Sequence, residues 1–346
     1  MMNVPALDDL GTIFRRSAAL QAGVSAYDLR RLIELGQVRQ IGRGVYSRPT
    51  GLADGQPWAI LREEHLRRCE EQVAIHPGHV LSHQSAGVLH GLQLRLHPAM
   101  DVHLTSVDRA PCSRRASGLQ LHHADSVVNA TQLVRGVRAT TIDRTLADIL
   151  RTSRLPNGVA ALDAAVRDGL TTARRVRAVL DTQTRWKGRP RACQALSLHD
   201  ATRESWLESF SFVALHEFGV PIPTPQVEVL DEGFHLVGRV DGLLGSVFLE
   251  ADGASKYYFL CDELGLTPDE SLARTQAAQE DRHRRLVRLG LHGVRWTTRE
   301  VTRHPEVVAG RIHQALAAAT PDRFRGWFRT QGQIVRPELL TPQTSP

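Results

Sequence analysis

The stretch from Glu204 to Lys256 constrains the fold most, because one helical pattern and three strand patterns follow one another within it. Apolar residues recur three and four positions apart from Ser205 to Phe218, and Gly219 and Pro221 follow, which predicts a helix that ends there. Strand patterns follow at residues 226–229, 236–241 and 246–253, and a Gly-flanked turn at residues 242–245 separates the last two. We therefore expect a helix, a first strand and then a hairpin.

Carboxylates stand where these elements would meet. Side chains alternate along a strand, so Glu250 and Asp252 fall on one face of the second hairpin strand, and Asp241 ends the partner strand. Glu208 lies in the first turn of the expected helix. Oxygen ligands of this kind suit Mg²⁺, or Mn²⁺ in its place, with water and phosphate completing the coordination shell. The pattern predicts a metal site formed by Asp241, Glu250 and Asp252.

Each carboxylate also has a structural explanation. Ser205-x-x-Glu208 is a capping box, in which the glutamate binds the backbone N–H of the cap residue. Glu204 is then an alternative helix carboxylate for the site. Asp241 could begin the Gly-flanked turn. The pair at the end of the apolar strand is harder to explain, because two carboxylates on one face repel each other unless a cation or a proton relieves them.

This stretch resembles the PD-(D/E)XK nuclease superfamily, especially its Vsr-like members. Glu208, Asp241 and Glu250 match the helix glutamate, the aspartate before a turn and the acidic residue of the next strand. The family usually has a lysine two residues after that acidic residue, where this chain has Asp252, and Lys256 lies four residues further on. The resemblance implies a restriction-endonuclease-like α/β domain, with Glu208, Asp241, Glu250 and Lys256 as catalytic residues for Mg²⁺-dependent cleavage of DNA.

Composition indicates a folded protein that suits a nucleic-acid partner. The chain has 346 residues, which predicts two or three domains, and its net charge of +6 is compatible with DNA. Lysine is rare, at two of 43 basic residues, so the placement of Lys256 near the carboxylates is not expected by chance. The sequence has no apolar run long enough for a membrane span, no signal-peptide pattern and only widely spaced cysteines. We expect a cytoplasmic protein.

Residues 8–50 are expected to form a small winged helix. Helices are predicted at Asp8–Arg16, from Ser17 onward, and at Ala26–Leu35, where Ser25 is the cap residue. Residues 38–46 would form a hairpin, the wing. In such motifs one helix enters the major groove, so we expect DNA contacts from Tyr27, Arg30 and Arg31 on that helix and from Arg39 and Arg43 on the wing. The alternative is a helical domain with a solvated arginine face.

The first part of the chain is similar to AbiEi-family antitoxins, over roughly residues 1–150. The similarity rests on short runs in a characteristic order, at residues 22–25, 29–32, 43–46, 81–92 and 141–150. It implies a DNA-binding regulator of a type IV toxin–antitoxin system that represses its own operon, with a cognate toxin as a possible partner. No toxin is visible in this chain.

We expect a multidomain α+β and α/β protein. Its parts would be a winged helix-turn-helix, an α+β middle domain, a helical connector, a nuclease-like α/β domain and a tail, at residues 1–50, 51–150, 151–194, 195–330 and 331–346. The middle part contains histidines that invite a zinc site, namely His83, His90, His97, His103, His122 and His123. None of these pairs has HxxxH spacing and no cysteine lies at ligand spacing, so the sequence disfavours zinc.

Two functions follow from these patterns. The first is a DNA-binding antitoxin-like protein with a Mg²⁺-dependent endonuclease-like domain. The alternative is a non-enzymatic transcriptional autorepressor whose nuclease-like domain is inactive. A pure protein–protein adaptor is a third possibility, which would show no affinity for DNA.

Overall fold

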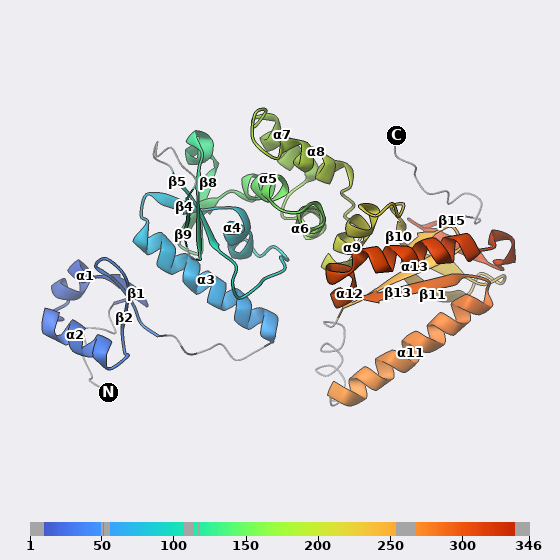
Figure 1. Ribbon diagram of the computed structural model, residues 1–346, viewed down its shortest axis with the longest axis horizontal. Helices are drawn as coiled ribbons and strands as arrows, with labels where there is room; N and C mark the ends of the chain where they lie inside the picture. Colours follow the sequence, from blue (N-terminus) through green and yellow to red (C-terminus); the bar gives the residue numbers. More distant parts are fainter. Residues whose placement is uncertain are drawn as a thin grey trace. The chain divides into compact units, whose positions relative to one another are not determined.

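The computed structural model describes residues 10–49, 51, 56–106, 114–116, 118–253 and 268–335. The chain forms two compact units, one of residues 1–152 with 174–183 and one of residues 153–173 with 184–346. Helices and three sheets make it a mixed α+β multidomain protein, as the sequence predicts (Figure 1). Among the described residues, no helix combines the length and the apolar character needed to cross a membrane.

Residues 10–49, hereafter the N-terminal segment, carry two helices and a small sheet. Its elements are β1 (Ile13–Arg15), α1 (Arg16–Gln21), α2 (Ala26–Glu34), β2 (Arg39–Gly42) and β3 (Val45–Ser47). The strands are antiparallel in the order β1-β3-β2. Ser25 and Asp28 form a reciprocal capping box at the start of α2, so the predicted cap is confirmed.

The helix expected at Asp8–Arg16 is wrong where the structure describes it. Ile13–Arg15 is a strand, and the helix begins at Arg16. Phe14 gives the reason, because its side chain is buried and stacks on Tyr46 with ring centroids 5.7 Å apart. Its backbone pairs with β3 at the same point. A partner strand far along the chain therefore overrides the local helical pattern.

The second sheet belongs to the middle of the chain and has the strand order β6-β7-β5-β4-β9-β8. Its strands are β4 (His79–Leu81), β5 (Val102–Ser106), β6 (Arg114–Ala116), β7 (Leu119–His123), β8 (Thr131–Val134) and β9 (Val137–Thr140). The helices here are α3 (Pro57–Ile75), α4 (His83–Leu89), the 3-10 helix η2 (Asp125–Ala130) and α5 (Ile142–Thr152). Leu66 of α3 and Ala86 of α4 pack with Leu81 and Leu104 of the sheet to form the core of this part.

Three helices follow, α6 (Leu155–Arg167), α7 (Ala173–Asp181) and α8 (Arg189–Ser197). The region expected as a single connector, residues 151–194, is divided between the two units. Helix α7 belongs to the first unit, whereas α6 and α8 belong to the second. There α6 packs along α9 (Trp206–His216).

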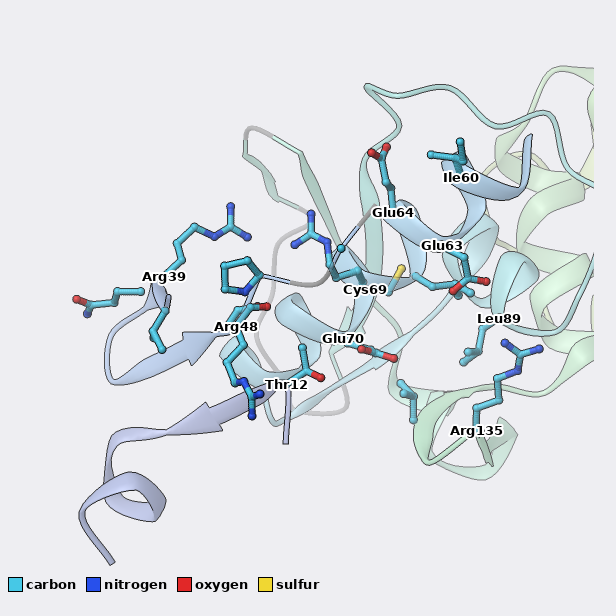
Figure 2. Close-up of a pocket in the computed structure, with 18 of the residues that line it drawn as sticks. Thr12, Arg39, Arg48, Ile60, Glu63, Glu64, Cys69, Glu70, Leu89 and Arg135 are labelled. Atoms are coloured by element: carbon cyan, nitrogen blue, oxygen red, sulfur yellow. The ribbon is translucent and has the colours of Figure 1, made fainter. Parts of the chain in front are cut away.

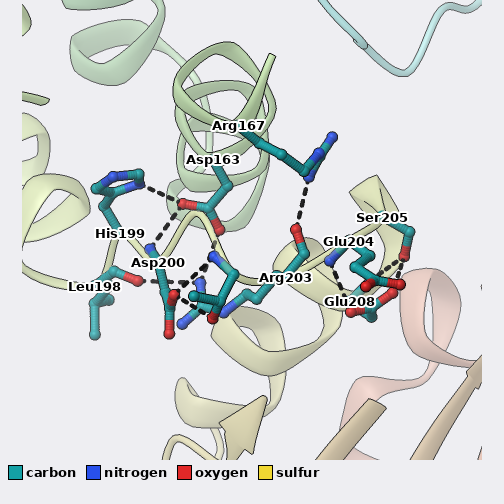
Figure 3. A network of polar contacts seen from close by, with 10 residues as sticks. Asp163, Arg167, Leu198, His199, Asp200, Arg203, Glu204, Ser205 and Glu208 are labelled. Carbon is teal, nitrogen blue, oxygen red and sulfur yellow. Dashed lines mark hydrogen bonds and ion pairs between the residues drawn. The ribbon is translucent and has the colours of Figure 1, made fainter. Parts of the chain in front are cut away.

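A buried carboxylate on α6 fixes the entry into α9. Asp163 is 0% exposed and accepts hydrogen bonds from Arg203 Nη1 at 2.9 Å and from the backbone N–H of Asp200 at 3.0 Å. His199 Nδ1 lies 2.7 Å from the same carboxylate (Figure 3). Since Arg203 is itself 1% exposed, the two charges must neutralise each other. The loop that carries Ser205 and Glu208 is thereby held at the start of α9.

The third sheet lies between two helical layers, with the order β13-β12-β11-β10-β14-β15. Its strands are β10 (Thr224–Leu230), β11 (Leu236–Leu244), β12 (Val247–Asp252), β13 (His292–Thr297), β14 (Trp327–Thr330) and β15 (Gln333–Val335). One core packs α9, α12 (Thr298–Arg303) and α13 (Pro305–Ala318) against one face. The other packs Leu286 of α11 (Pro268–Arg288) and Phe324, which follows η3 (Pro321–Arg323), against the opposite face. β13 runs parallel to β12, and the β10–β11–β12 pairs are antiparallel.

Two sequence boundaries move in the structure. Strand β11 continues to Leu244, so the turn is the tight connection at Gly245, where φ is +56°, and not the four residues 242–245. Asp241 consequently lies within the strand and does not end it. The tail expected from residue 331 contains strand β15, which pairs with β14 at the edge of the sheet.

We expect Asp163→Ala to lower the free energy of unfolding of this unit by about 3–5 kcal/mol, because Arg203 would keep a buried charge without its carboxylate. Urea unfolding of the full chain, followed by tryptophan fluorescence, measures the change. The matched control is Glu217→Ala, which removes an exposed carboxylate at the other end of α9 and should change the unfolding free energy by less than about 0.5 kcal/mol. Equal transition midpoints for the two variants would contradict the role given to Asp163.

Candidate functional site

Helix α2 presents three predicted DNA-contact residues on one exposed face. Tyr27, Arg30 and Arg31 stand three and four positions apart, which places them side by side on a helix. All three are exposed, and the Tyr27 side chain is 64% exposed although it is a large ring. The opposite face of the helix buries Leu29 and Leu32. The helix is thus amphipathic, with an aromatic and basic outer surface.

The two arginines that the sequence analysis assigns to a wing, Arg39 and Arg43, differ in their surroundings. Arg43 is exposed in the turn between β2 and β3. Arg39 begins β2, and its Nη2 lies 2.8 Å from Oε1 of Glu71 on α3, which also accepts from Arg67 at 2.6 Å. The Arg39 side chain remains 60% exposed, whereas that of Glu71 is 9% exposed. Arg39 is therefore anchored to α3, and Arg43 is the arginine of the β2–β3 hairpin that is directed to solvent.

A cavity of about 930 Å³ lies beside this anchor, between the N-terminal segment and α3. Arg39 and Arg48 are on its N-terminal side, and Glu63 and Glu64 are on the α3 side (Figure 2). Arg135 of the β8–β9 turn also lines it. Carboxylates and guanidinium groups thus both face the cavity, and its lining favours neither an anionic nor a cationic ligand.

In the second unit, Glu208 lies in the first turn of α9, as the sequence predicts. It is 3% exposed and accepts from Ser205 Oγ at 2.7 Å and from the backbone N–H of Glu204 at 3.0 Å, so the backbone bond goes to the residue before the cap and not to Ser205 as the capping box predicts. Oε2 of Glu208, which accepts from Glu204, also accepts from Gln226 Nε2 of β10 at 2.7 Å. Glu204 instead pairs with Arg239 and is half exposed. Both carboxylates therefore contact the sheet, Glu208 through Gln226 of β10 and Glu204 through Arg239 of β11, but only Glu208 is buried.

The sheet opens around Asp241. In the described part of the sheet, the β10–β11 ladder passes from Pro225–Gly242 to Val227–Val240, and the β11–β12 ladder stops at Gly242–Leu249, so both ladders leave out Asp241. Asp241 Oδ2 accepts from the backbone N–H of Ala251 at 2.8 Å, replacing the missing ladder bond. Continued by one step beyond its last pair, the β11–β12 register would place Asp241 opposite Glu250.

The backbone of Gln226, which lies across from Asp241 on β10, is also distorted at this opening. Its φ is +53°, a left-handed conformation that costs a non-glycine residue of the order of 1 kcal/mol. The distortion extends to the neighbouring strand β11, where side chains no longer alternate regularly between the two faces of the sheet. A Cβ on Gly242 would meet Phe212 of α9, whereas a Cβ on Gly238 would meet Arg282 of α11. Residues four apart on one strand therefore face opposite layers, and the side chain of Gln226 reaches Glu208.

Glu250 is as deeply buried as Glu208, at 2% exposed. Arg282 of α11 binds its Oε1, and Arg295 of β13 binds its Oε2 through Nε at 3.1 Å and through Nη2. Arg295 Nε also lies 3.2 Å from Asp252. Partial burial alone lowers the pKa of Arg295, but the hydrogen bond and charge of Glu250, with Asp252 and Glu280, outweigh it, and the pKa is raised.

The four carboxylates Glu208, Asp241, Glu250 and Asp252 are hereafter the carboxylate cluster; among the described residues, no three of them have ligand oxygens within 4.8 Å of one another. They are an all-oxygen donor set of the kind Mg²⁺ prefers. Both oxygens of Glu250 are bound by guanidinium groups, so an ion that used this residue would have to displace at least one of them. Lys256, the expected catalytic lysine, lies outside the described residues.

Sequence reasoning did not assign Gln226, Arg282 and Arg295 to this site. Arg295 pairs directly with Glu250, because β12 and β13 are parallel neighbours in the sheet. That register cannot be read from spacing, since more than forty residues separate the two positions. Arg282 depends on Gly238, which leaves room for its side chain to lie across β11.

We expect Gly238→Ala to destabilise the protein by about 1 kcal/mol, because the added Cβ would lie 2.9 Å from Cγ and Cδ of Arg282 and push it away from Glu250. Gly310→Ala on α13 is the control, since a Cβ there meets no described atom within 4 Å. Alanine is the better helix former, so this variant should gain up to about 1 kcal/mol. Thermal unfolding of both proteins measures the difference, and a shift in the same direction for both would contradict the packing described.

Comparison with known families places the first part of the chain. Residues 4–49 match the family described as "Transcriptional regulator, AbiEi antitoxin". Among curated proteins, none matches this sequence. The antitoxin resemblance is confirmed for that segment, which contains α2 and the hairpin of β2 and β3, and the resemblances of residues 50–150 and of the C-terminal domain stay predictions. Residues 4–49 are thus an AbiEi antitoxin-type transcriptional regulator domain.

Proposed function

We propose that this protein is a DNA-binding transcriptional regulator of the antitoxin type, in which α2 enters the major groove. The observation that carries the proposal is the exposed Tyr27–Arg30–Arg31 face within the segment that matches the AbiEi family. Arginine can bind guanine edges or phosphate, and a tyrosine beside it can contact the backbone or a base. The partners would be operator DNA and a toxin encoded by the same operon.

Charge distribution supports the same surface. The N-terminal segment contains seven arginines against two carboxylates, a net charge of +5, while the whole chain carries +6. Nearly all of the excess positive charge therefore lies in 40 residues. Arg43 at the tip of the β2–β3 hairpin would reach a phosphate beside the groove, and the Glu71 anchor would hold Arg39 close to the same strand of DNA.

We expect Arg30→Ala/Arg31→Ala to weaken binding to a DNA fragment from the protein's own promoter by about 10- to 100-fold or more, and to lower the salt dependence of binding. Gel shift at several salt concentrations measures both effects. The control is Arg299→Ala/Arg303→Ala, which removes the same charge from exposed positions on α12. An equal loss of affinity in both variants would show that binding depends on net charge alone and not on the α2 face. No binding by the unaltered protein would contradict the proposal.

A second candidate function for the same chain is Mg²⁺-dependent hydrolysis of DNA phosphodiester bonds at the carboxylate cluster. The observation that favours it is the opened sheet, where the β11–β12 register, continued by one step, would bring Asp241 opposite Glu250, and where Glu208 is linked to β10 through Gln226. The element order supports it too, because a helix, three antiparallel strands, a helix and a parallel strand follow one another from α9 to β13. Expected roles are metal binding for Asp241, Glu250 and Asp252.

Metal binding would exchange partners at Glu250. A bound Mg²⁺ would polarise a phosphate and activate water. For Glu250 to serve as a ligand, Arg282 or Arg295 would release it, and a freed guanidinium is well suited to a phosphate oxygen. Lys256 would orient the water or stabilise the developing charge. If the guanidinium groups hold Glu250 against the ion, the domain is a non-enzymatic contact surface and the chain acts as a repressor alone.

We expect the unaltered protein to nick supercoiled DNA with Mg²⁺ or Mn²⁺, and Asp241→Asn to abolish nicking, because this change removes a charged oxygen ligand. Agarose electrophoresis of plasmid DNA measures the cleavage. Asp231→Asn is the control, since it alters a carboxylate in the exposed turn before β11. Equal nicking by Asp241→Asn and the unaltered protein, or none by either, would exclude this centre and leave the regulator proposal standing.

A further inference from the structure

Three histidines that lie far apart in the sequence meet in the first unit, and we call His83, His103 and His122 the histidine cluster. One ring nitrogen from each lies within 4.8 Å of the others. His103 Nδ1 and His122 Nε2 are 2.9 Å apart, and the rings of His83 and His122 stack with centroids 3.7 Å apart. They come from the start of α4, from β5 and from β7. Spacing rules for helices could not find such a group.

The parallel strands β5 and β7 bring two of these residues together. Thr105 pairs with His122, and His103 lies two residues before Thr105 on the same face of the sheet. The alternate residues Val102, Leu104 and Leu119 point to the apolar core on the other face. Side-chain alternation thus places His103, Thr105 and His122 together.

The backbone is distorted where the third histidine joins. His83 has a φ of +50°, which is costly for a residue with a Cβ, and it is buried. Ser82 stands in the N-cap position of α4, but in the described structure its hydroxyl bonds His83 Nδ1 at 3.0 Å and caps no backbone N–H. A missing cap costs about 1 kcal/mol. The backbone strain at His83 and the missing cap at Ser82 both cost stability, and both features place the His83 imidazole in the cluster.

An orphaned polar group points to the same place. Thr105 is 1% exposed, and its Oγ1 has no hydrogen-bond partner among the described residues. A buried hydroxyl without a partner costs roughly 1–3 kcal/mol, so such a group in a native protein calls for a ligand or water. Because Thr105 lies between the two strand histidines on their face, a ligand held by the histidines would be within its reach.

We propose that His83, His103 and His122 bind one divalent transition-metal ion of the zinc class. Three neutral imidazoles leave a fourth position open, as in sites that keep a water or an anion on the metal. Tetrahedral Zn–N bonds of 2.0–2.1 Å require nitrogen separations of roughly 3.3 Å. The His103 and His122 nitrogens are 2.9 Å apart, and the nitrogens of all three rings lie within 4.8 Å of one another. To form the site, the stacked rings of His83 and His122 would move apart, and the bond between His103 and His122 would give way to two metal bonds.

The protonation state of the rings suits such an ion, and the positive charge of the neighbouring arginines would have to be offset by a further ligand. Burial lowers the pKa of His83 well below its usual value and lowers the pKa of His122 to about 4, so both rings are neutral at pH 7 and can donate a lone pair. Ser82 bonds Nδ1 of His83 and leaves Nε2 for the metal. Nearby, Arg144 and Arg151 share Asp148, and the remaining positive charge favours a negatively charged fourth ligand.

The test titrates chelator-treated, full-length protein with Zn²⁺ by calorimetry and with Co²⁺ by visible absorption. We expect one tight equivalent of Zn²⁺, and a Co²⁺ spectrum of the intense tetrahedral type, since the ligands are three imidazoles. His103→Gln and His122→Gln should each weaken Zn²⁺ binding by about 100-fold or more and remove that spectrum. His97→Gln, which changes an exposed histidine of the same unit, should bind as the unaltered protein does.

Two results would overturn the proposal. One is the absence of a tight equivalent in the unaltered protein, which needs no variant and no assumption about folding. The other is unchanged binding in His103→Gln and His122→Gln, which would assign the metal to another place. Far-ultraviolet circular dichroism of the metal-free variants shows that each is folded before it is titrated. An equivalent loss in His97→Gln would also count against the site.

Discussion

Glu250 is the group on which the C-terminal unit depends, because a carboxylate that is 2% exposed must be neutralised where it stands. Two guanidinium groups do this, Arg282 from α11 and Arg295 from β13. The ion pairs connect the centre of the sheet to a covering helix and to the neighbouring strand. The same carboxylate is the one that the proposed metal would need, so stability and the proposed metal-dependent chemistry would compete for one side chain.

The distortion of the sheet explains how these groups come within reach of one another. Gln226 takes a left-handed conformation, Asp241 leaves both ladders, and Gly238 makes room for Arg282. With regular pairing, the backbone groups of Gln226 and Asp241 would bond within the ladders. The side chain of Gln226 would then not be turned toward Glu208. The opened ladder instead uses side chains to satisfy the backbone, as Asp241 does for Ala251. Local strain concentrated in this way is typical of sites where a ligand is bound.

Helix α3 plays a comparable part in the first unit. Its Glu71 holds Arg39 of the wing, and its Ala74 carbonyl accepts from Arg15 of β1. The same helix carries His65, which bonds Ser85 within the middle core, and Ser85 in turn accepts from the backbone of His103. Helix α3 therefore contacts both the segment that carries the proposed DNA surface and, through Ser85, strand β5, which carries His103 of the histidine cluster. The two proposals concern different ligands but share this helix.

The sequence by itself determined what depends on neighbouring residues. Spacing and capping gave α2, α9 and the hairpin, and alternation put Glu250 and Asp252 on one strand face. Strand β1, the Arg295 partner of Glu250 and the meeting of His83 with His122 depended on pairings between distant segments. Only the tertiary structure decided these, because local periodicity fixes which face a side chain occupies, whereas the register between remote strands follows from packing of the whole core.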